Sequence, residues 1–319
     1  MYSYSDIRYV HLEISTRCNA ACPGCPRNLC GVDVIDDFPL HDMTLAEAKQ
    51  IFTPQFLEQI NRMHINGNLG DFVTCRDGLE IVRYFRQHNA NLVIDISTNA
   101  GVRSNIWAEL AQLKAIVIFC IDGLDGTHQL YRQQTQWATV MANAAQFIAA
   151  GGQAVWKMIK FDHNQHQEAE CRALSRQLGF SRFELVDHGR NEFPVFDQKG
   201  RFRHSIGSAD QPTAFERVLW LHYDGMNSTP TVNNRTIRCQ SVRDRSVYIS
   251  ATGEVSPCCW LGFYPRTMYH LGNAELIKLL PASNNALEVG LEQAIEWFDL
   301  IEKSWHQDQL FACNTNCGS

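Results

Sequence analysis

Three cysteines near the start of the sequence are spaced for metal chemistry. Cys18, Cys22 and Cys25 form a C-x3-C-x2-C pattern. Three thiolates suit a four-iron cluster in which one iron has no protein ligand. Catalytic metal sites keep such an open position, whereas structural sites are closed. The alternatives are a structural zinc site, for which Cys30 is a fourth ligand close by, and a ferredoxin-like electron carrier.

Four further cysteines in the C-terminal part of the chain are enough to close a second metal site. Cys239 is followed by thirteen residues, Gly253, four residues and Cys258. Cys313 and Cys317 complete the set. A zinc ion held by four thiolates is one occupant that this set allows. Cys259 is adjacent to Cys258, so the sequence allows either residue as the ligand at this point. The spacing favours Cys258.

The composition limits the class of protein. The chain has 319 residues, 45% of them hydrophobic, and a formal net charge of -6. This charge argues against a general nucleic-acid surface, which is basic, and no segment has the roughly 18 consecutive apolar residues of a membrane span. The N-terminus lacks the features of a signal peptide, so we expect a cytoplasmic protein. In that compartment, 12 cysteines indicate metal binding or redox work rather than disulfides.

Up to about residue 190, apolar runs alternate with helical periodicity. The runs predict buried parallel strands at 7–15, 62–67, 91–98, 115–121, 154–161 and 182–187. Helices are predicted between them at 43–60, 76–89, 105–114, 137–152 and 164–180, and Thr44 with Glu47 forms a capping box at the start of the first. Six β/α repeats with short connections predict a partial (β/α)6 barrel of the TIM-like class. Chemistry in such a barrel gathers at the carboxyl ends of the strands, where the first three cysteines lie.

The rest of the chain does not continue this alternation of strands and helices. Residues 191–235 are rich in turn formers and predict a connector that lines the substrate opening. Residues 236–319 predict a small α+β domain, with a β-hairpin that turns at Thr252-Gly253 and an amphipathic helix over 285–305. The predicted organisation is therefore a barrel over 1–190, a connector, and a C-terminal domain.

These motifs resemble the radical S-adenosylmethionine (radical SAM) superfamily, whose C-x3-C-x2-C signature follows the first strand of a partial (β/α)6 barrel. In "GNLGDF", Gly70 and Asp71 match the Gly-Glu of the family's Gly-Gly-Glu-Pro motif. Thr98 and Asn99 resemble its Thr-Asn-Gly motif. The segment "FCIDGLDGTHQLYR" resembles its Ser-x-Asp-Gly segment, with the cysteine in place of the usual serine.

The resemblance implies how S-adenosylmethionine (SAM) would be bound. The backbone around Gly70 and Asp71 would hold the methionyl amine, and Arg132 would hold the carboxylate with its planar, permanently charged guanidinium. Cys120 and Asp122 belong to the same cofactor-binding set, as do the two residues of the Thr-Asn-Gly motif. Reductive cleavage of SAM would then give a 5′-deoxyadenosyl radical that abstracts a hydrogen atom from substrate. Gly24 stands where the family commonly has an aromatic residue near the adenine.

The second cysteine group resembles the C-terminal extension called SPASM, in its shortened "twitch" form with one auxiliary [4Fe-4S] cluster. The resemblance implies that Cys239, Cys258, Cys313 and Cys317 are its four ligands, which gives two [4Fe-4S] clusters in all. With all four thiolates from protein, the auxiliary cluster would relay or accept electrons rather than bind substrate.

The resemblance implies a radical SAM oxidoreductase, most often acting on ribosomal peptides or proteins. Only seventeen residues precede Cys18, so we expect no leader-binding domain, and either a separate partner presents the peptide or the substrate is small. The alternatives are a small-molecule dehydrogenase and, in another class, a two-cluster electron-transfer or zinc-stabilised binding protein. An external reductant of the flavodoxin or ferredoxin type is implied, with no nucleic-acid or membrane partner. Asp187 and His188, at the end of the sixth strand, are the weak candidates for proton transfer.

Overall fold

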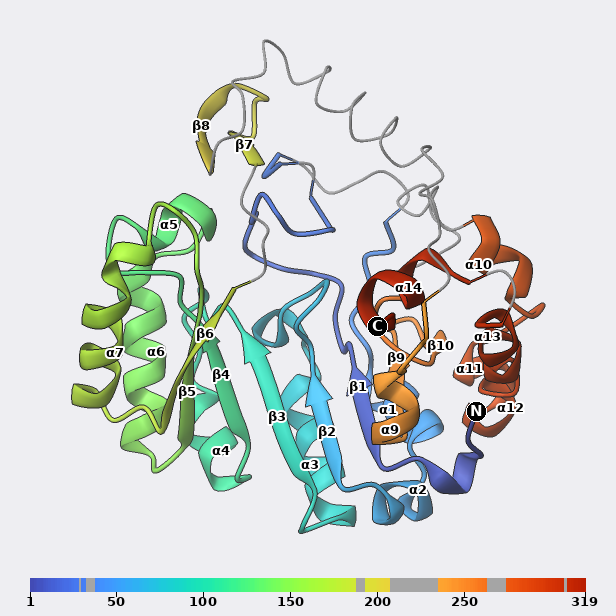
Figure 1. Ribbon diagram of the computed structural model, residues 1–319. Coiled ribbons are helices and arrows are strands. Elements are labelled where there is room, and N and C mark those ends of the chain that lie inside the picture. Colours follow the sequence, from blue (N-terminus) through green and yellow to red (C-terminus); the bar gives the residue numbers. More distant parts are fainter. Residues whose placement is uncertain (29, 33–37, 188–192, 207–234, 263–273, 307–308) are drawn as a thin grey trace.

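The computed structural model describes residues 1–28, 30–32, 38–187, 193–206, 235–262, 274–306 and 309–319. In this part of the chain a mixed sheet has the strand order β10-β9-β1-β2-β3-β4-β5-β6 (Figure 1). Its strands are β1 (Tyr9–Leu12), β2 (Arg62–Ile65), β3 (Val93–Thr98), β4 (Ile116–Cys120), β5 (Gln153–Ile159), β6 (Arg182–Val186), β9 (Ser246–Ile249) and β10 (Val255–Ser256). The strands from β9 through β1 to β6 are parallel to one another, and β10 is antiparallel to β9.

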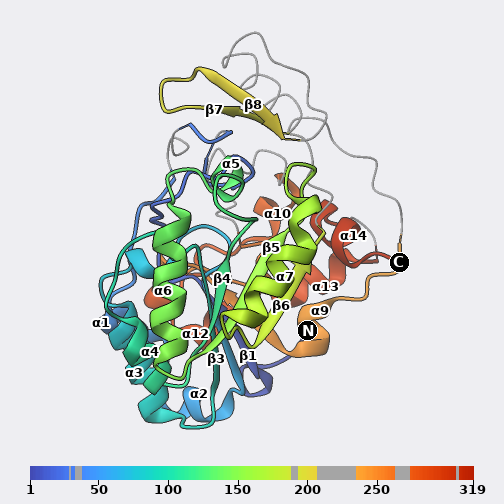
Figure 2. The same cartoon turned by 90° about the vertical axis from the view of Figure 1, so that its left-hand side faces the viewer.

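Helices alternate with the parallel strands, as the pattern predicted. They are α1 (Leu45–Ile51), α2 (Pro54–Gln59), α3 (Gly78–His88), α4 (Trp107–Gln112), α5 (His128–Tyr131), α6 (Trp137–Ala149) and α7 (Glu168–Gln177), with 3-10 turns η1 (Tyr4–Asp6), η2 (Phe72–Thr74) and η3 (Gln165–Gln167). Figure 2 shows α3, α4 and α6 along one face of the strands. The predicted α/β class with a partial barrel is confirmed. No described helix is long and apolar enough to cross a membrane.

The first predicted helix, over 43–60, is wrong as a single element. Its start is as expected, because Thr44 and Glu47 form the capping box. The helix ends at Ile51 with Phe52 as its C-cap, and α2 begins at Pro54 with Thr53 as its N-cap. Proline at the first position of a helix has no N–H to donate and disfavours helical backbone in the residue before it, so a new helix starts there.

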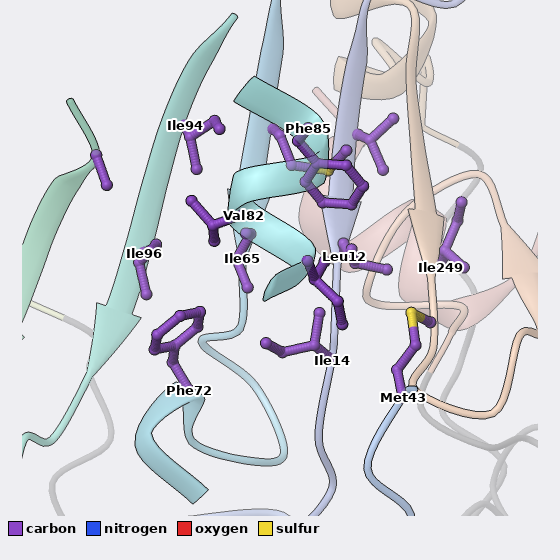
Figure 3. Close-up of a cluster of buried hydrophobic side chains, with 14 of the residues drawn as sticks. Leu12, Ile14, Met43, Ile65, Phe72, Val82, Phe85, Ile94, Ile96 and Ile249 are labelled. Atoms are coloured by element: carbon purple, nitrogen blue, oxygen red, sulfur yellow. The ribbon is translucent and has the colours of Figure 1, made fainter. Parts of the chain in front are cut away.

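Each strand presents an apolar face to these helices. From β1 and its continuation, Leu12 and Ile14 point towards Val82 and Phe85 of α3, beside Ile65 of β2 (Figure 3). All five side chains are fully buried. Because side chains alternate along a strand, the residues between them face the inside of the open barrel. That inner face carries polar groups, which belong to the site described below.

The C-terminal part of the chain extends the barrel sheet. Strand β9 pairs in parallel with β1, with Tyr9 opposite Ser246 and Leu12 opposite Ile249. The β9–β10 hairpin turns at Gly253, whose φ of +94° is a left-handed conformation that glycine adopts without strain. The helices of this part are α9 (Gln240–Asp244), α10 (Ala274–Leu279), α11 (Ala286–Val289), α12 (Leu291–Ala294), α13 (Phe298–Ser304) and α14 (Phe311–Cys317).

The expected single helix over 285–305 is also wrong, since it is three short helices. The break between α11 and α12 lies at Gly290, which has φ +80° and ψ 155°. Ile295 and Trp297 then separate α12 from α13 as the C-cap and the N-cap of the two helices. Both side chains are buried, so tertiary packing rather than helix continuity sets the path.

The predicted connector contains a hairpin of its own. Strands β7 (Phe193–Phe196) and β8 (Phe202–Ile206) pair antiparallel and lie beyond the carboxyl ends of the barrel strands (Figures 1 and 2). Val195 and Ile206 pack in one cluster with Cys22, and the Gln198 amide donates to the carbonyls of Gly31 and Val32. The hairpin therefore covers the first cysteine loop. Residues 207–234 of the connector lie outside the described part.

The packing of α3 against the sheet generates the first prediction. Phe85 is fully buried and makes an edge-to-face contact with Phe52, their ring centroids 5.2 Å apart. We expect Phe85→Ala to lower the free energy of unfolding by about 3–5 kcal/mol, because it leaves a cavity in the core. Val93→Ala, at a side chain that is 45% exposed, is the control, with an expected change within about 0.5 kcal/mol. Urea unfolding followed by circular dichroism on anaerobically purified protein measures both, and equal losses would contradict the assignment.

Candidate active site

The first three cysteines lie in the loop that leaves β1 at its carboxyl end. The Cys25 N–H donates to the Cys22 carbonyl at 3.0 Å, so the backbone turns back between these two cysteines. Arg27 is buried and donates to the carbonyls of Cys18 and Ala20, at 3.1 and 3.3 Å. These bonds fix the loop from within.

The electrostatics of the thiols show that they lie close together. Burial raises the pKa of Cys18 well above its usual value, and the charges of Asp71, Cys22 and Cys25 raise it further. Burial raises the pKa of Cys22 to about 12, although Arg132 opposes this effect. Thiols of this kind give up their protons when a metal binds, so the group is suited to binding metal as thiolates.

A single metal ion and a four-iron cluster need different arrangements of thiols. In the described ranges, no three His, Cys, Asp or Glu side chains converge tightly enough to hold one metal ion. A zinc ion draws four ligands to within about 2.3 Å of itself. A four-iron cluster is a larger body, and its thiolates are spread around it. Burial raises the pKa of the Cys30 thiol, the alternative fourth ligand, to about 11.

The loop that contains the predicted Gly70 and Asp71 packs against the cysteine loop. A Cβ on Gly70 would lie 1.8 Å from the Ser15 carbonyl oxygen, so only glycine allows this approach of the two backbones. The Asp71 N–H donates to the Arg17 carbonyl at 2.8 Å. On the other side of the loop, the Cys25 sulfur lies 4.0 Å from the Asn68 carbonyl oxygen. The loop therefore lies beside the thiols.

The carboxylate of Asp71 is occupied by the neighbouring strand end. It accepts hydrogen bonds from the Thr98 hydroxyl at 2.7 Å, the Asn99 N–H at 2.6 Å and the Val73 N–H at 3.1 Å. Burial raises the pKa of Asp71 while these hydrogen bonds oppose the rise. The Asn99 side chain in turn donates to the Cys18 sulfur at 3.4 Å. The structure thus brings the predicted Thr98, Asn99, Gly70 and Asp71 together around the first cysteine.

Asp122 and Arg132 form a buried ion pair next to the thiols. The Arg132 Nε donates to Asp122 at 2.6 Å, and its Nη1 donates to the Cys22 sulfur at 3.8 Å. Asp122 also accepts the Ile159 N–H at 2.7 Å, which ties the pair to the end of β5. Cys120 is close enough to Arg132 for the guanidinium to lower the pKa of its thiol, against the raising effect of burial. Arg132 therefore places a positive charge at the cysteine site.

Only one of the two residues predicted for proton transfer lies in the described part of the chain. The Asp187 carboxylate is 58% exposed and forms an ion pair with Lys160 at 2.8 Å. His188 lies outside the described residues. Their catalytic role stays a prediction.

Sequence reasoning missed a polar network on the inner face of β1, β2 and β3. The Glu13 carboxylate is fully buried and accepts from His11 at 3.2 Å. His64 pairs with Asp95, which also accepts two hydrogen bonds from Arg62, at 2.8 and 3.2 Å. The rings of His11 and His64 are in edge contact, 4.9 Å apart. The alternating pattern of polar residues in 7–15 and 62–67 was the signal, but the cross-strand partners depend on the register.

The second cysteine group lines a cavity of about 160 Å³ beside β9. Cys239, Cys258, Cys313 and Cys317 all contribute to its wall, together with aromatic side chains that include Tyr9, Tyr248 and Trp305. Burial raises the pKa of Cys258 well above its usual value, and the charges of Cys259, Cys313 and Cys239 add to this. The four thiols that were predicted as one ligand set therefore surround one space.

Cys258 and Cys259 differ in their surroundings. Cys258 interacts electrostatically with Cys239 and Cys313 of the ligand set. Cys259 also borders the cavity, but it is hydrogen-bonded to His11 of β1. This difference favours Cys258 as the ligand and leaves Cys259 as a neighbour of the inner-face network.

Comparisons with known proteins give the fold. No family model and no curated protein matches the chain. SuiB of Streptococcus suis bound to S-adenosylmethionine matches with a TM-score of 0.58 and 13% identity, over 96% of this chain and 67% of SuiB. The predicted partial-barrel fold is confirmed. Native anSMEcpe with bound AdoMet and the Kp18Cys peptide matches with a TM-score of 0.56 and 15% identity, over 97% of this chain and 89% of that one.

The site also generates a prediction on pH. Burial lowers the pKa of His11, but hydrogen bonds to Cys259 and Glu13 outweigh it and raise the pKa to about 9. A raised folded-state pKa stabilises the fold fully below the ordinary value of 6.5, and this contribution is lost as the pH rises through about 9. The charged and titratable neighbours are Glu13, Cys259 and His64.

We therefore expect the free energy of unfolding of the wild type to fall between pH 6.5 and pH 9.5 by about 2–3 kcal/mol more than that of His11→Gln. Urea unfolding at a series of pH values measures the difference. His88→Gln, at a partly buried histidine in the last turn of α3, is the control and should follow the wild type. Parallel curves for the wild type and His11→Gln would disprove the charge assignment.

Proposed function

We propose that this chain is a radical SAM enzyme that abstracts a hydrogen atom from a peptide or protein substrate. The observation that carries the proposal is the convergence of Cys18, Cys22 and Cys25 with the Gly70 loop and Arg132 at the carboxyl ends of the barrel strands. The shared fold with SAM-bound SuiB and anSMEcpe supports it.

Three thiolates would hold a [4Fe-4S] cluster, with one iron open to SAM. When bound, the cluster and SAM supply reductive cleavage of the sulfonium and a 5′-deoxyadenosyl radical. The chain's own residues would bind and orient the cofactor. Arg132, fixed by Asp122, lies beside Cys22 and presents further N–H donors for the methionyl carboxylate. The backbone of the loop before Asp71 would accept from the methionyl amine.

The hairpin β7–β8 would exclude water from the reaction. Its Val195 and Ile206 are buried against Cys22, Tyr131 and Phe161. An apolar cover of this kind protects a reactive radical from side reactions with solvent.

A peptide or protein substrate is supported by the neighbours. SuiB is found bound to its precursor peptide SuiA, and anSMEcpe to the Kp18Cys peptide. We propose the same class of substrate here, with a flavodoxin-type or ferredoxin-type protein as electron donor. A separate partner protein that presents the peptide belongs to the same proposal.

The second cysteine group would hold an auxiliary [4Fe-4S] cluster and accept an electron from the substrate radical. Four thiols around a common cavity support a fully protein-ligated centre. Oxidation of substrate by two electrons needs such an acceptor: the hydrogen atom leaves with the deoxyadenosyl group, and one further electron and a proton leave the substrate radical.

The activity is tested by the formation of 5′-deoxyadenosine. Anaerobically reconstituted protein with SAM and dithionite should form it, and the triple variant Cys18→Ala, Cys22→Ala, Cys25→Ala should fall to the level of buffer. Cys171→Ala is the matched control, because Cys171 is buried in α7 and belongs to neither cysteine group. Liquid chromatography with mass detection measures the product. A wild type that forms none would overturn the proposed function.

The auxiliary centre is tested by metal content. We expect about eight irons per chain in the wild type, about four in Cys258→Ala and about eight in Cys259→Ala. Iron, sulfide and zinc analysis with Mössbauer spectra measures this. About four irons and one zinc in the wild type would instead make the second site structural. Equal losses in both variants would contradict the choice of Cys258.

A further inference from the structure

The Glu13 carboxylate binds the inner side of the loop that lies beside the thiols. It is fully buried, directly after β1. Its Oε1 accepts the Asn68 N–H at 3.1 Å, and its Oε2 is 3.5 Å from the Leu69 nitrogen. The Asn66 amide donates to Oε2 at 3.3 Å. A charged acceptor therefore holds two successive backbone N–H groups and the side chain at the start of the loop.

This contact sets the direction of the loop carbonyls. A trans peptide is planar, and its N–H and C=O point in opposite directions. The Leu69 N–H and the Asn68 carbonyl belong to one peptide unit, with Glu13 on the N–H side and the Cys25 sulfur on the carbonyl side. The Gly67 carbonyl shares its unit with the Asn68 N–H, so it too points away from Glu13. The loop thus turns carbonyl oxygens towards the thiol side.

The first residues of the loop have a backbone conformation that needs support from neighbouring groups. Asn66 has φ +59° and Gly67 has φ +129°, both in the left-handed half of backbone space. Asparagine tolerates such a conformation when its side chain is bonded locally. Here the Asn66 amide is anchored to Glu13 and to the Ser15 carbonyl, each at 3.3 Å. Glu13 is thus part of what stabilises the strained start of the loop.

The Asp71 carboxylate is not able to bind the backbone N–H groups of this loop as Glu13 does. Its oxygens are engaged by Thr98, Asn99 and Val73, as described above. The family motif carries a longer glutamate at that position, and the resemblance implied that the backbone around Gly70 and Asp71 would hold the methionyl amine. In this chain the buried carboxylate on the back of the loop is Glu13 instead. His11 lies 3.2 Å from Glu13 Oε1 and gives the buried carboxylate a further hydrogen-bonding partner.

We propose that Glu13 is a positioning residue for the methionyl ammonium group of SAM, acting through the peptide units Gly67–Asn68 and Asn68–Leu69. An ammonium group has three donors and no acceptor, so it is recognised by carbonyl oxygens. A carboxylate bonded to the N–H of a peptide polarises it and strengthens the carbonyl of the same unit as an acceptor. The inference rests on the proposed function, because it needs SAM to bind at the thiols.

The test compares two ligands that differ only in the amino group. They are S-adenosylhomocysteine and its desamino analogue, titrated calorimetrically into anaerobically reconstituted protein. In the wild type, S-adenosylhomocysteine should bind more tightly than the analogue. Glu13→Gln should weaken S-adenosylhomocysteine about 10- to 100-fold, since a charge-assisted network is lost, and should weaken the analogue less than about twofold. Circular dichroism and iron content establish that the variant is folded and loaded.

The matched control is Glu254→Gln, the same substitution at a different carboxylate. Glu254 accepts hydrogen bonds from the Ser250 and Thr252 hydroxyls at the β9–β10 turn and does not contact the loop. Its variant should bind both ligands as the wild type does. Equal weakening of both ligands in Glu13→Gln would show a merely structural role and overturn the inference, as would unchanged affinity for both.

Two further results separate this inference from the proposed function. A wild type that binds neither ligand would overturn the proposed function and the inference with it. A wild type that prefers the amine, with the same preference in Glu13→Gln, would overturn the inference alone. If Glu13→Gln does not retain iron, Glu13→Asp decides, because it keeps the charge but cannot reach both N–H groups. A reduced preference for the amine then supports the inference, and an unchanged preference contradicts it.

Discussion

The close approach of the Gly70 backbone to the chain after β1 is the constraint on which the site depends. No side chain fits between Gly70 and the Ser15 carbonyl. With this contact in place, the Asp71 N–H reaches Arg17, and the Asp71 carboxylate reaches Thr98 and Asn99. Asn99 then reaches Cys18. One steric contact thereby connects the carboxyl ends of β1, β2 and β3 and fixes one side of the cysteine loop.

The two faces of β1 differ in polarity and in what they contact. Val10 and Leu12 are buried in the hydrophobic core on the helical side of the sheet, part of which Figure 3 shows. His11 and Glu13 face inward, where burial of charge is costly unless each group has a partner. Opposite charges and hydrogen bonds within the network offset that cost. At its end, the network binds the loop that faces the thiols. Polar groups inside the barrel thus shape the site even where they do not reach it.

The sequence was sufficient for features that are local. The C-x3-C-x2-C spacing, the Thr44 capping box and the Gly253 turn depend on a few adjacent residues, and the six strands follow from apolar runs. The breaks at Pro54 and Gly290 were also visible locally, but helical periodicity on both sides outweighed them in the prediction. At Pro54 the missing N–H decides, and at Gly290 a positive φ that glycine accepts without strain.

Features that depend on pairing between distant segments were out of reach. The role of Glu13 can be predicted only when the register of β1 against β2 is known. The strands of the β7–β8 hairpin are short and aromatic, and they were not recognised as strands within the turn-rich sequence around them. The position of β9 beside β1 is the largest such feature. Parallel pairing across more than two hundred residues leaves no trace in either segment alone, because the partner strand of a ladder is chosen by the whole sheet.

The pairing of β9 with β1 bears on what the second cysteine group is for. Strand β1 delivers the first cysteine loop from its carboxyl end, and it is hydrogen-bonded along its length to the strand whose hairpin leads to Cys258. The distance between the two groups is therefore set by a backbone ladder rather than by a linker. A centre that only stabilised the C-terminal segment would need no fixed distance from the first site. Electron transfer does need one, since its rate falls steeply with separation. The continuous sheet thus fixes the separation that the proposed electron transfer between the two sites would need.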